Sequence, residues 1–126
     1  MSFDFSVDTP IYLQIIVYLK EQIVSGKLKA GQKIASVREL SAWLNVNPNT
    51  TQKALSELEE SGLIVTERTN GKFVTKNLSV IEKAKKEMIK ENLQKFFKSM
   101  NKIGLSYQEC IDAITNGGVK YERFGS

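Results

Sequence analysis

Two helix starts follow one another closely in the stretch SVRELSAWLNVNPNTTQKALSELEESG, which begins at Ser36. Ser36 precedes Glu39 by the spacing of a capping box, in which each side chain bonds the backbone N–H of the other residue. Asn47 and Pro48 are residue types favoured at the N-cap and the first position of a second helix. Because only a tight turn at residues 45–46 separates the two helices, the sequence predicts a helix-turn-helix.

A further helix and a β-hairpin flank this pair. Thr9 as N-cap and Pro10 at the first helical position predict a helix start, and apolar residues then recur at helical spacing until a glycine. Two runs rich in β-branched residues, 63–68 and 72–76, enclose residues 69–71, whose Asn-Gly pair favours a hairpin turn. The residues expected in the core are Ile11, Ile15, Ile16, Leu19, Ile23, Val37, Leu40, Trp43, Leu44, Ala54, Leu55 and Leu58.

The sequence beyond residue 77 predicts a helical extension with a wide apolar stripe. Helix starts of the capping-box type are expected at Ser79 with Glu82 and at Ser106 with Glu109. One helix packed on a small domain needs a narrower stripe, so burial against a second copy of the chain, a homodimer, is the economical explanation. The residues expected in this dimer interface are Ile81, Met88, Ile89, Leu93, Phe96, Phe97 and Met100.

The elements together predict a mainly α fold with a small β-hairpin. We expect a winged helix-turn-helix domain at residues 1–77, a helical dimerisation region at 78–117 and a C-terminal tail at 118–126. No internal repeat or low-complexity linker interrupts this order.

Composition narrows the chemistry that this chain can perform. The 126 residues include one cysteine and no histidine, which excludes an internal disulfide and leaves too few ligands for a Cys/His metal site. Without histidine there is no Ser-His or Cys-His pair, and no glycine-rich phosphate loop occurs, so we expect neither an enzyme nor a cofactor. Cys110 lies beside Ile111 and Ile114, which favours a buried structural thiol over a redox sensor.

The net charge of +4 permits a polyanionic partner without requiring one. No basic segment followed by an apolar run stands at the N-terminus, and no stretch approaches the roughly 18 apolar residues of a membrane span. We therefore expect a soluble cytoplasmic protein that has no membrane partner.

The second helix of the predicted helix-turn-helix has no acidic residue in its first turn. In this motif the second helix enters the major groove of DNA with its N-terminal residues facing base edges. Amides, hydroxyls and a lysine can donate there to bases or phosphates, whereas a carboxylate would be repelled. A merely solvated helix start is the alternative explanation. The residues predicted to contact DNA in this segment are Asn47, Asn49, Thr50, Thr51, Gln52 and Lys53.

Residues outside this helix complete the predicted DNA surface. Arg38 lies in the first turn of the preceding helix, which should cross the DNA backbone, and we predict that it contacts a phosphate or a base. Thr69, Asn70 and Gly71 form the expected tip of the wing. Lys72 beside them is either an ordinary hairpin-tip charge or a phosphate contact, and the sequence leaves both open.

Several separated segments occur in the order and spacing of a known family, namely PIYLQI, SGKLKAGQKI, SVREL, NPNTTQKALSELEESGLI and GKFV. Through them residues 10–74 resemble the DNA-binding domain of GntR-type bacterial transcription regulators. The resemblance implies that Arg38, the helix start from Asn49 to Lys53 and the wing contact operator DNA. The sequence departs from the family with Pro48 where arginine is often found and with Thr51 where valine is usual.

The short extension resembles one branch of that family. Some fifty residues follow Lys76, too few to enclose much of a ligand pocket. The segment NPNT and this layout are similar to YtrA-like regulators, which join a winged domain to a short helical dimerisation tail and often govern transporter operons. The resemblance implies a repressor that binds a palindromic double-stranded DNA operator as a homodimer, with no effector identified. The alternative is an interaction module whose basic amphipathic segment 79–102 meets a protein or an anionic membrane.

Overall fold

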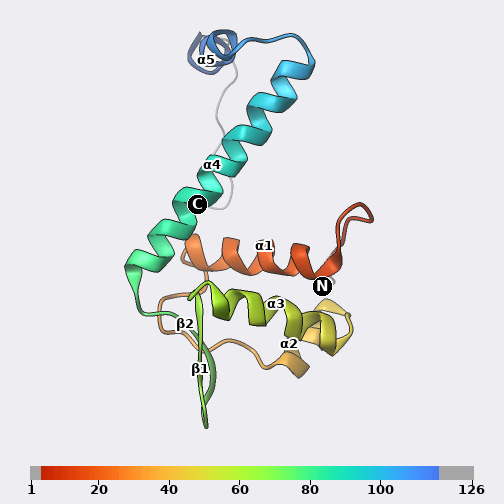
Figure 1. Cartoon of the computed structure of the whole chain (residues 1–126), viewed down its shortest axis with the longest axis vertical. Helices are drawn as coiled ribbons and strands as arrows, with labels where there is room; N and C mark the ends of the chain where they lie inside the picture. Colours follow the sequence, from red (N-terminus) through yellow and green to blue (C-terminus); the bar gives the residue numbers. More distant parts are fainter. Residues whose placement is uncertain (1–3, 117–126) are drawn as a thin grey trace. The chain divides into compact units, whose positions relative to one another are not determined.

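The computed structural model describes residues 4–116, and the predicted fold class is confirmed there. The elements are α1 (Ile11–Val24), α2 (Val37–Leu44), α3 (Pro48–Glu60), β1 (Ile64–Glu67), β2 (Gly71–Val74), α4 (Leu78–Lys102) and α5 (Tyr107–Asn116). Figure 1 shows α1 and α3 side by side, with the antiparallel β1–β2 hairpin extending away from them as the wing. None of the helices in this part of the chain is long and apolar enough to cross a membrane.

The two helix starts of the helix-turn-helix form as predicted. Ser36 Oγ accepts a hydrogen bond from the Glu39 N–H at 3.1 Å, and Glu39 Oε1 accepts one from the Ser36 N–H at 3.1 Å. Asn47 Oδ1 accepts from the Asn49 N–H at 2.8 Å. Between the helices Asn45 takes the left-handed conformation with a φ of 57°, which ends α2 and turns the chain into α3.

Two other predicted caps are wrong. Pro10 has a non-helical ψ of 138° and occupies the N-cap position of α1 that the sequence assigns to Thr9, with no side-chain hydrogen bond. In α4 the N-cap is not Ser79, because Asn77 Oδ1 accepts from the Ser79 N–H at 3.0 Å. Asn caps as well as Ser does and comes first along the chain, so the helix begins there.

The core of the winged domain lies between α1, α2, α3 and the hairpin. Trp43, expected in this core, is 46% exposed, so that prediction is wrong. Leu40 and Leu44 fill the inward face of the short α2, and the neighbouring Trp43 lies at its edge with its ring 5.8 Å from that of Tyr18. Ile11 is also exposed, and Val37 is half-buried. The largest fully buried apolar side chains of the domain are Ile15, Ile23, Leu44, Leu55, Leu58, Leu63, Ile64 and Val74.

The predicted hairpin is present, but its turn is longer than an Asn-Gly turn. Ile64 pairs with Val74 and Glu67 with Gly71, which leaves residues 68–70 as a three-residue loop. Gly71 has a φ of 105°, whereas Asn70 does not take a positive φ. A three-residue loop followed by a glycine of positive φ is a common hairpin connection.

The segment before α2 adds a third, irregular strand to the hairpin. The Ile34 N–H donates to the Lys72 carbonyl at 2.8 Å, and the Val74 N–H donates to the Gln32 carbonyl at 2.9 Å. Lys33 forms a bridge with Phe73 between these bonds. The basic loop predicted before α2 is thereby fixed against the wing.

The chain divides into two compact units, Met1–Lys85 and Lys86–Ser126. Their border falls inside α4, whereas the sequence placed the domain boundary between residues 77 and 78. The reason is that Val80, Ile81 and Ala84 pack against the core of the winged domain. The expected tail at residues 118–126, and the glycine pair expected to end the last helix, lie outside the described residues.

The second unit contains the rest of α4 and the short helix α5. The predicted capping box at the start of α5 is confirmed, because Ser106 Oγ accepts from the Glu109 N–H at 3.2 Å and Glu109 Oε1 accepts from the Ser106 N–H at 3.0 Å. Cys110 is buried, as its apolar neighbours predict.

Candidate nucleic-acid interface

The start of α3 presents amide groups and no acidic residue in its first turn. Asn49 and Gln52 are exposed, and they lie about one helical turn apart. Gln52 Nε2 donates to Ser56 Oγ at 3.2 Å, which orients this amide along the helix surface. Asn47 is also exposed, but its side-chain oxygen caps α3, so its NH₂ group is the part left to donate. Thr50 is half-buried between these positions.

Thr51 does not belong to this surface, which corrects the prediction that it contacts DNA. Its side chain is fully buried, and its hydroxyl oxygen lies 2.8 Å from that of Ser41, which is buried as well. Ser41 is on α2, so the bond joins the two helices of the motif inside their corner. A buried hydroxyl without a partner is costly, and each of these two groups satisfies the other.

Lys53 is exposed but has a partner within the chain. Its Nζ lies 3.9 Å from the centre of the Tyr12 ring, which is cation–π geometry. Tyr12 is on α1, so this contact joins α3 to α1. The Tyr12 ring therefore holds the Lys53 ammonium in place near the start of α3.

Arg38 is exposed in the first turn of α2, where the sequence placed it. The neighbouring Glu39 is occupied by the capping box, and its pKa is lowered by hydrogen bonds from the backbone and side chain of Ser36. Its carboxylate is thus held at the helix end, where negative charge is favourable. Arg38 remains as the cationic group of this turn.

The tip of the wing lies beside the loop that precedes α2. Asn70 Nδ2 donates to Glu67 Oε2 at 3.2 Å, and this bond connects the two ends of the wing loop. A Cβ at Gly71 would lie 3.2 Å from Lys33 Cε, so the Lys33 side chain lies close to the tip of the wing. A groove of about 270 Å³ separates them, and its lining residues are Lys33, Ile34, Ala35, Ser36, Val37, Glu39, Asn70, Gly71 and Lys72.

Lys72 is not a free charge at the wing tip. It lies on β2 opposite Thr66, and its Nζ forms an ion pair with the carboxylate of Glu59 on α3 and a 3.2 Å hydrogen bond with Thr66 Oγ1. The ammonium therefore faces α3 of its own chain. The prediction of a phosphate contact at Lys72 does not fit this arrangement.

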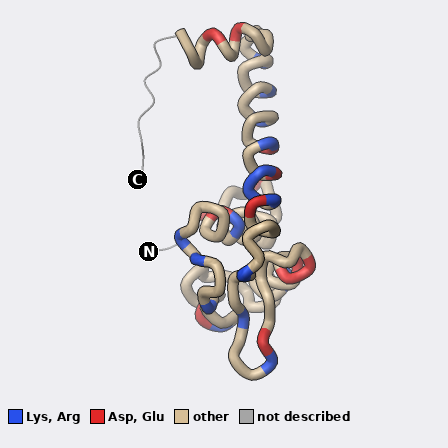
Figure 2. Tube along the Cα trace, turned by 90° about the vertical axis from the view of Figure 1, so that its left-hand side faces the viewer, with Lys and Arg blue, Asp and Glu red and all other residues tan. Residues whose placement is uncertain are grey.

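Two basic residues that the sequence reasoning missed lie nearer the tip. Arg68 is the first residue of the wing loop, and Lys33 lies across the groove from the tip; both are exposed. Near the end of the hairpin Figure 2 shows basic and acidic positions side by side. The available signal was the adjacency of Arg68 to the predicted turn at 69–71.

Comparison with known proteins shows to which family the chain belongs. Residues 11–74 match the model of the family described as bacterial regulatory proteins, gntR family. The chain belongs to the GntR family. Members of this family bind DNA and regulate transcription, and the chain is a transcriptional regulator with a GntR helix-turn-helix domain, not an enzyme.

Relatives of this GntR chain match it over most of its length. It is 38% identical to the HTH-type transcriptional repressor YtrA of Bacillus subtilis, over 89% of this chain and 92% of that protein. A GntR family transcriptional regulator from Listeria monocytogenes has a TM-score of 0.82 and 38% identity, over 92% of this chain and 100% of that one. The AraR DNA-binding domain in complex with operator ORX1 has a TM-score of 0.54 and 26% identity, over 60% of this chain and 95% of that one.

The part of α4 that lies in the second unit of this GntR chain, residues 86–102, has an apolar face that is incompletely buried. Ile89 and Leu93 are 50% and 48% exposed. The ring of Phe97 lies 5.4 Å from that of Phe96 and 5.1 Å from that of Tyr107 on α5. Ile81, which the sequence assigned to the dimer interface, packs instead against the core of the winged domain. The half-buried members of the predicted interface in this part of α4 are Met88, Phe96, Phe97 and Met100.

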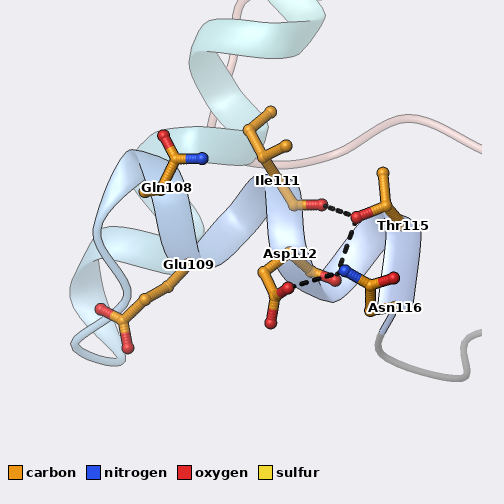
Figure 3. Close-up of a pocket in the computed structure, with 6 residues that line it drawn as sticks. All are labelled: Gln108, Glu109, Ile111, Asp112, Thr115 and Asn116. Atoms are coloured by element: carbon orange, nitrogen blue, oxygen red, sulfur yellow. Dashed lines mark hydrogen bonds between the residues drawn. The ribbon is translucent and has the colours of Figure 1, made fainter.

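A depression of about 380 Å³ lies along α5 (Figure 3). Two of its polar side chains bond to their own helix: Thr115 Oγ1 donates to the Ile111 carbonyl at 2.9 Å, and Asn116 Nδ2 donates to Asp112 Oδ1 at 2.8 Å. In Figure 3 the carboxylate of Glu109 points away from that of Asp112. Polar groups do not converge there, so the depression lacks the character of a ligand or metal site. Within residues 4–116 no group of His, Cys, Asp and Glu could hold a metal ion.

Proposed function

We propose that this GntR-family regulator is a homodimeric repressor that binds a pseudo-palindromic operator. The observation that carries the proposal is the exposed, acid-free start of α3, where Asn49 and Gln52 stand at the helix end that enters the major groove in this motif. The exposed Arg38 on α2 and Arg68 on the wing would supply positive charge for phosphates.

The homodimer is supported by the apolar face of α4. Ile89 and Leu93 leave about half of each side chain exposed, and Phe96 and Phe97 continue the same face. A second copy related by two-fold symmetry would cover this face and present two recognition helices to half-sites of the same symmetry. The interface proposed is therefore residues 86–102 of α4 together with α5, without Ile81.

The sign of regulation is supported by whole-length similarity to YtrA, which is named a transcriptional repressor. We extend to this chain both repression and, on the YtrA-like layout, control of a transporter operon. Transcript levels of neighbouring operons in a deletion strain test both points. A rise in a transporter transcript is expected, and a fall would make the protein an activator.

A footprinting experiment tests the proposed operator. The full chain is titrated onto the promoter region of its own operon, and two protected half-sites are expected, with their centres about one helical turn, roughly 10 bp, or a multiple of it apart. Protection of a single asymmetric half-site would contradict the two-fold arrangement. Equal binding to the promoter and to random duplex would contradict sequence-specific regulation.

The alternative of a membrane-surface module has a specific observation in its favour. Figure 2 shows basic positions along much of α4, and the same helix carries the exposed Ile89 and Leu93. Co-sedimentation of the full chain with anionic and with neutral vesicles tests this alternative. Binding to anionic vesicles by a monomer that fails to bind DNA specifically would favour it over the operator-binding dimer.

A further inference from the structure

The side chain of Lys72 joins α3, the proposed recognition helix, to the wing, which is formed by β1 and β2. Lys72 on β2 forms an ion pair with Glu59 on α3, and its Nζ also bonds Thr66 Oγ1 on β1 at 3.2 Å. Across residues 4–116, this is the one ion pair with an N–O distance within 4.0 Å. The contact therefore stands out in a chain that has many exposed charges.

The two charged side chains are partly shielded from water. The Lys72 side chain is 19% exposed and the Glu59 side chain 31% exposed. Shielding strengthens the attraction relative to a fully exposed pair, whose contribution is often near zero. The hydroxyl of Thr66 on the paired strand fixes the ammonium further, so Lys72 is directed toward α3.

Glu59 lies at the opposite end of α3 from the residues that we propose to contact bases. Asn49 and Gln52 lie in the first turns of the helix, whereas Glu59 lies in its last turn, next to the wing. The adjacent Glu60 is exposed and forms no ion pair with the described residues. Two neighbouring glutamates thus carry the same charge, and only one of them contacts the wing.

We propose that Glu59 is a specificity-determining residue that acts through Lys72. It holds the wing at a fixed angle to α3, and it keeps the charge of Lys72 from the phosphates of any DNA sequence. The inference rests on the proposed function, since it concerns how the same DNA surface separates operator from random duplex. In this proposal Glu59 is a positioning residue, because it acts through its ion pair with Lys72.

The proposal has two opposite consequences for binding. Without Glu59 the wing is less well oriented, which weakens the operator complex, where geometry matters most. The released ammonium of Lys72 adds one phosphate contact that is independent of sequence, which strengthens binding to random DNA. For both reasons the preference of the protein for operator over random DNA falls.

The experiment compares Glu59→Gln with the matched control Glu60→Gln in the full chain. Both variants remove one negative charge from neighbouring positions of α3. Dissociation constants are measured on the footprinted operator and on random duplex over a range of salt concentrations. Lys72→Gln and the double variant Glu59→Gln/Lys72→Gln complete a cycle, and circular dichroism confirms that each variant is folded.

For Glu59→Gln we expect the ratio of random to operator dissociation constants to fall roughly tenfold. The salt slope on random duplex should steepen by about 0.9, the value of one added phosphate contact. Glu60→Gln should change both duplexes alike. Lys72→Gln should weaken operator binding with an unchanged salt slope, and the double variant should be no worse than Lys72→Gln.

Other outcomes overturn the proposal. Equal behaviour of Glu59→Gln and Glu60→Gln would show that only general charge matters. A salt slope on random duplex that is shallower by about 0.9 in Lys72→Gln would make Lys72 a phosphate contact in the wild type. If the wild-type chain itself does not discriminate, the proposed function fails and this inference with it, whereas discrimination by the wild type together with either result above refutes the inference alone.

Discussion

The hydroxyl oxygens of Ser41 and Thr51 lie 2.8 Å apart, and both side chains are buried where α2 meets α3. Each hydroxyl satisfies the other, and the bond spans the turn of the helix-turn-helix. Thr51 is thus part of the frame of the DNA surface and not of the surface itself.

Replacing Thr51 by valine keeps the shape of the side chain and removes its hydroxyl. Ser41 is then left without a buried partner, and we expect the free energy of unfolding to fall by about 1–3 kcal/mol. The double variant Ser41→Ala/Thr51→Val removes both hydroxyls and should recover most of that loss. Urea unfolding at one fixed protein concentration measures both changes.

The Thr51→Val variant also tests whether the hydroxyl of this residue contacts DNA. The folded variant should bind the operator as the wild type does. A variant of normal stability that loses operator affinity would show that the hydroxyl contacts DNA after all. Thr50→Val is the control at the neighbouring, half-buried position.

The order of elements was predictable because its signals are local. The capping box of Ser36 with Glu39, the Asn47 cap and the hairpin each depend on residues close together in the chain, and all three form. Side chains whose environment depends on distant elements were harder. Trp43 has helical spacing to the core residues of α2, but the core face of that short helix is already filled by Leu40 and Leu44.

The same contrast between local signals and contacts of distant residues holds for the candidate site. That α3 begins without acids and with exposed amides follows from its own sequence. The pairing of Lys72 with Glu59 joins residues that are distant in the chain, and no spacing rule within one element indicates it. The burial of Thr51 could have been predicted, because the family that the sequence resembles usually has valine at this position, and valine favours burial over contact with DNA.

The capping box of α2 should make stability depend on pH. The pKa of Glu39 is lowered from 4.5 by hydrogen bonds from the backbone and side chain of Ser36, so folding favours its charged form. A carboxyl group of lowered pKa contributes stability above its unfolded pKa, and this contribution disappears as the pH falls through the lower folded value. Glu39→Gln should therefore be less stable than wild type at pH 7, and the difference should shrink below about pH 4.5.

Urea midpoints of wild type and Glu39→Gln between pH 7 and pH 3 check this expectation. Glu39 is exposed, so we expect only a small difference in stability, and the test is decided by its direction. Glu57→Gln, in an exposed position of α3, is the control. A difference that grows on acidification would contradict the assigned pKa shift.

The proposed dimer predicts the effect of charges on the apolar face of α4. Leu93→Asp together with Phe96→Asp would place two carboxylates in the interface, and their desolvation should prevent association. We expect monomers in sedimentation, loss of tight operator binding and an intact winged domain, because both residues lie in the other compact unit. Asn92→Asp together with Gln94→Glu adds the same charge at exposed polar positions and should remain dimeric. A dimeric Leu93→Asp/Phe96→Asp variant would place the interface elsewhere.

The exposed amides of α3 should read bases and not merely bind phosphates. Asn and Gln side chains match the N6/N7 edge of adenine, and no arginine stands in the first turn of α3 to grip guanine, so we expect A·T pairs at the central positions of each half-site. Asn49→Ala or Gln52→Ala should cost about 1–3 kcal/mol on the operator and much less on random duplex.

Paired salt titrations on operator and random duplex separate reading from anchoring for each of these variants. Removing an amide that bonds a base lowers operator affinity with little change in the salt slope, because the protein still neutralises the same number of phosphates. Gln94→Ala removes an exposed amide from α4 and should alter neither duplex. Equal losses on both duplexes for Asn49→Ala and Gln52→Ala would show that these amides only position the helix, and would move the specific contacts to Arg38 or to the wing.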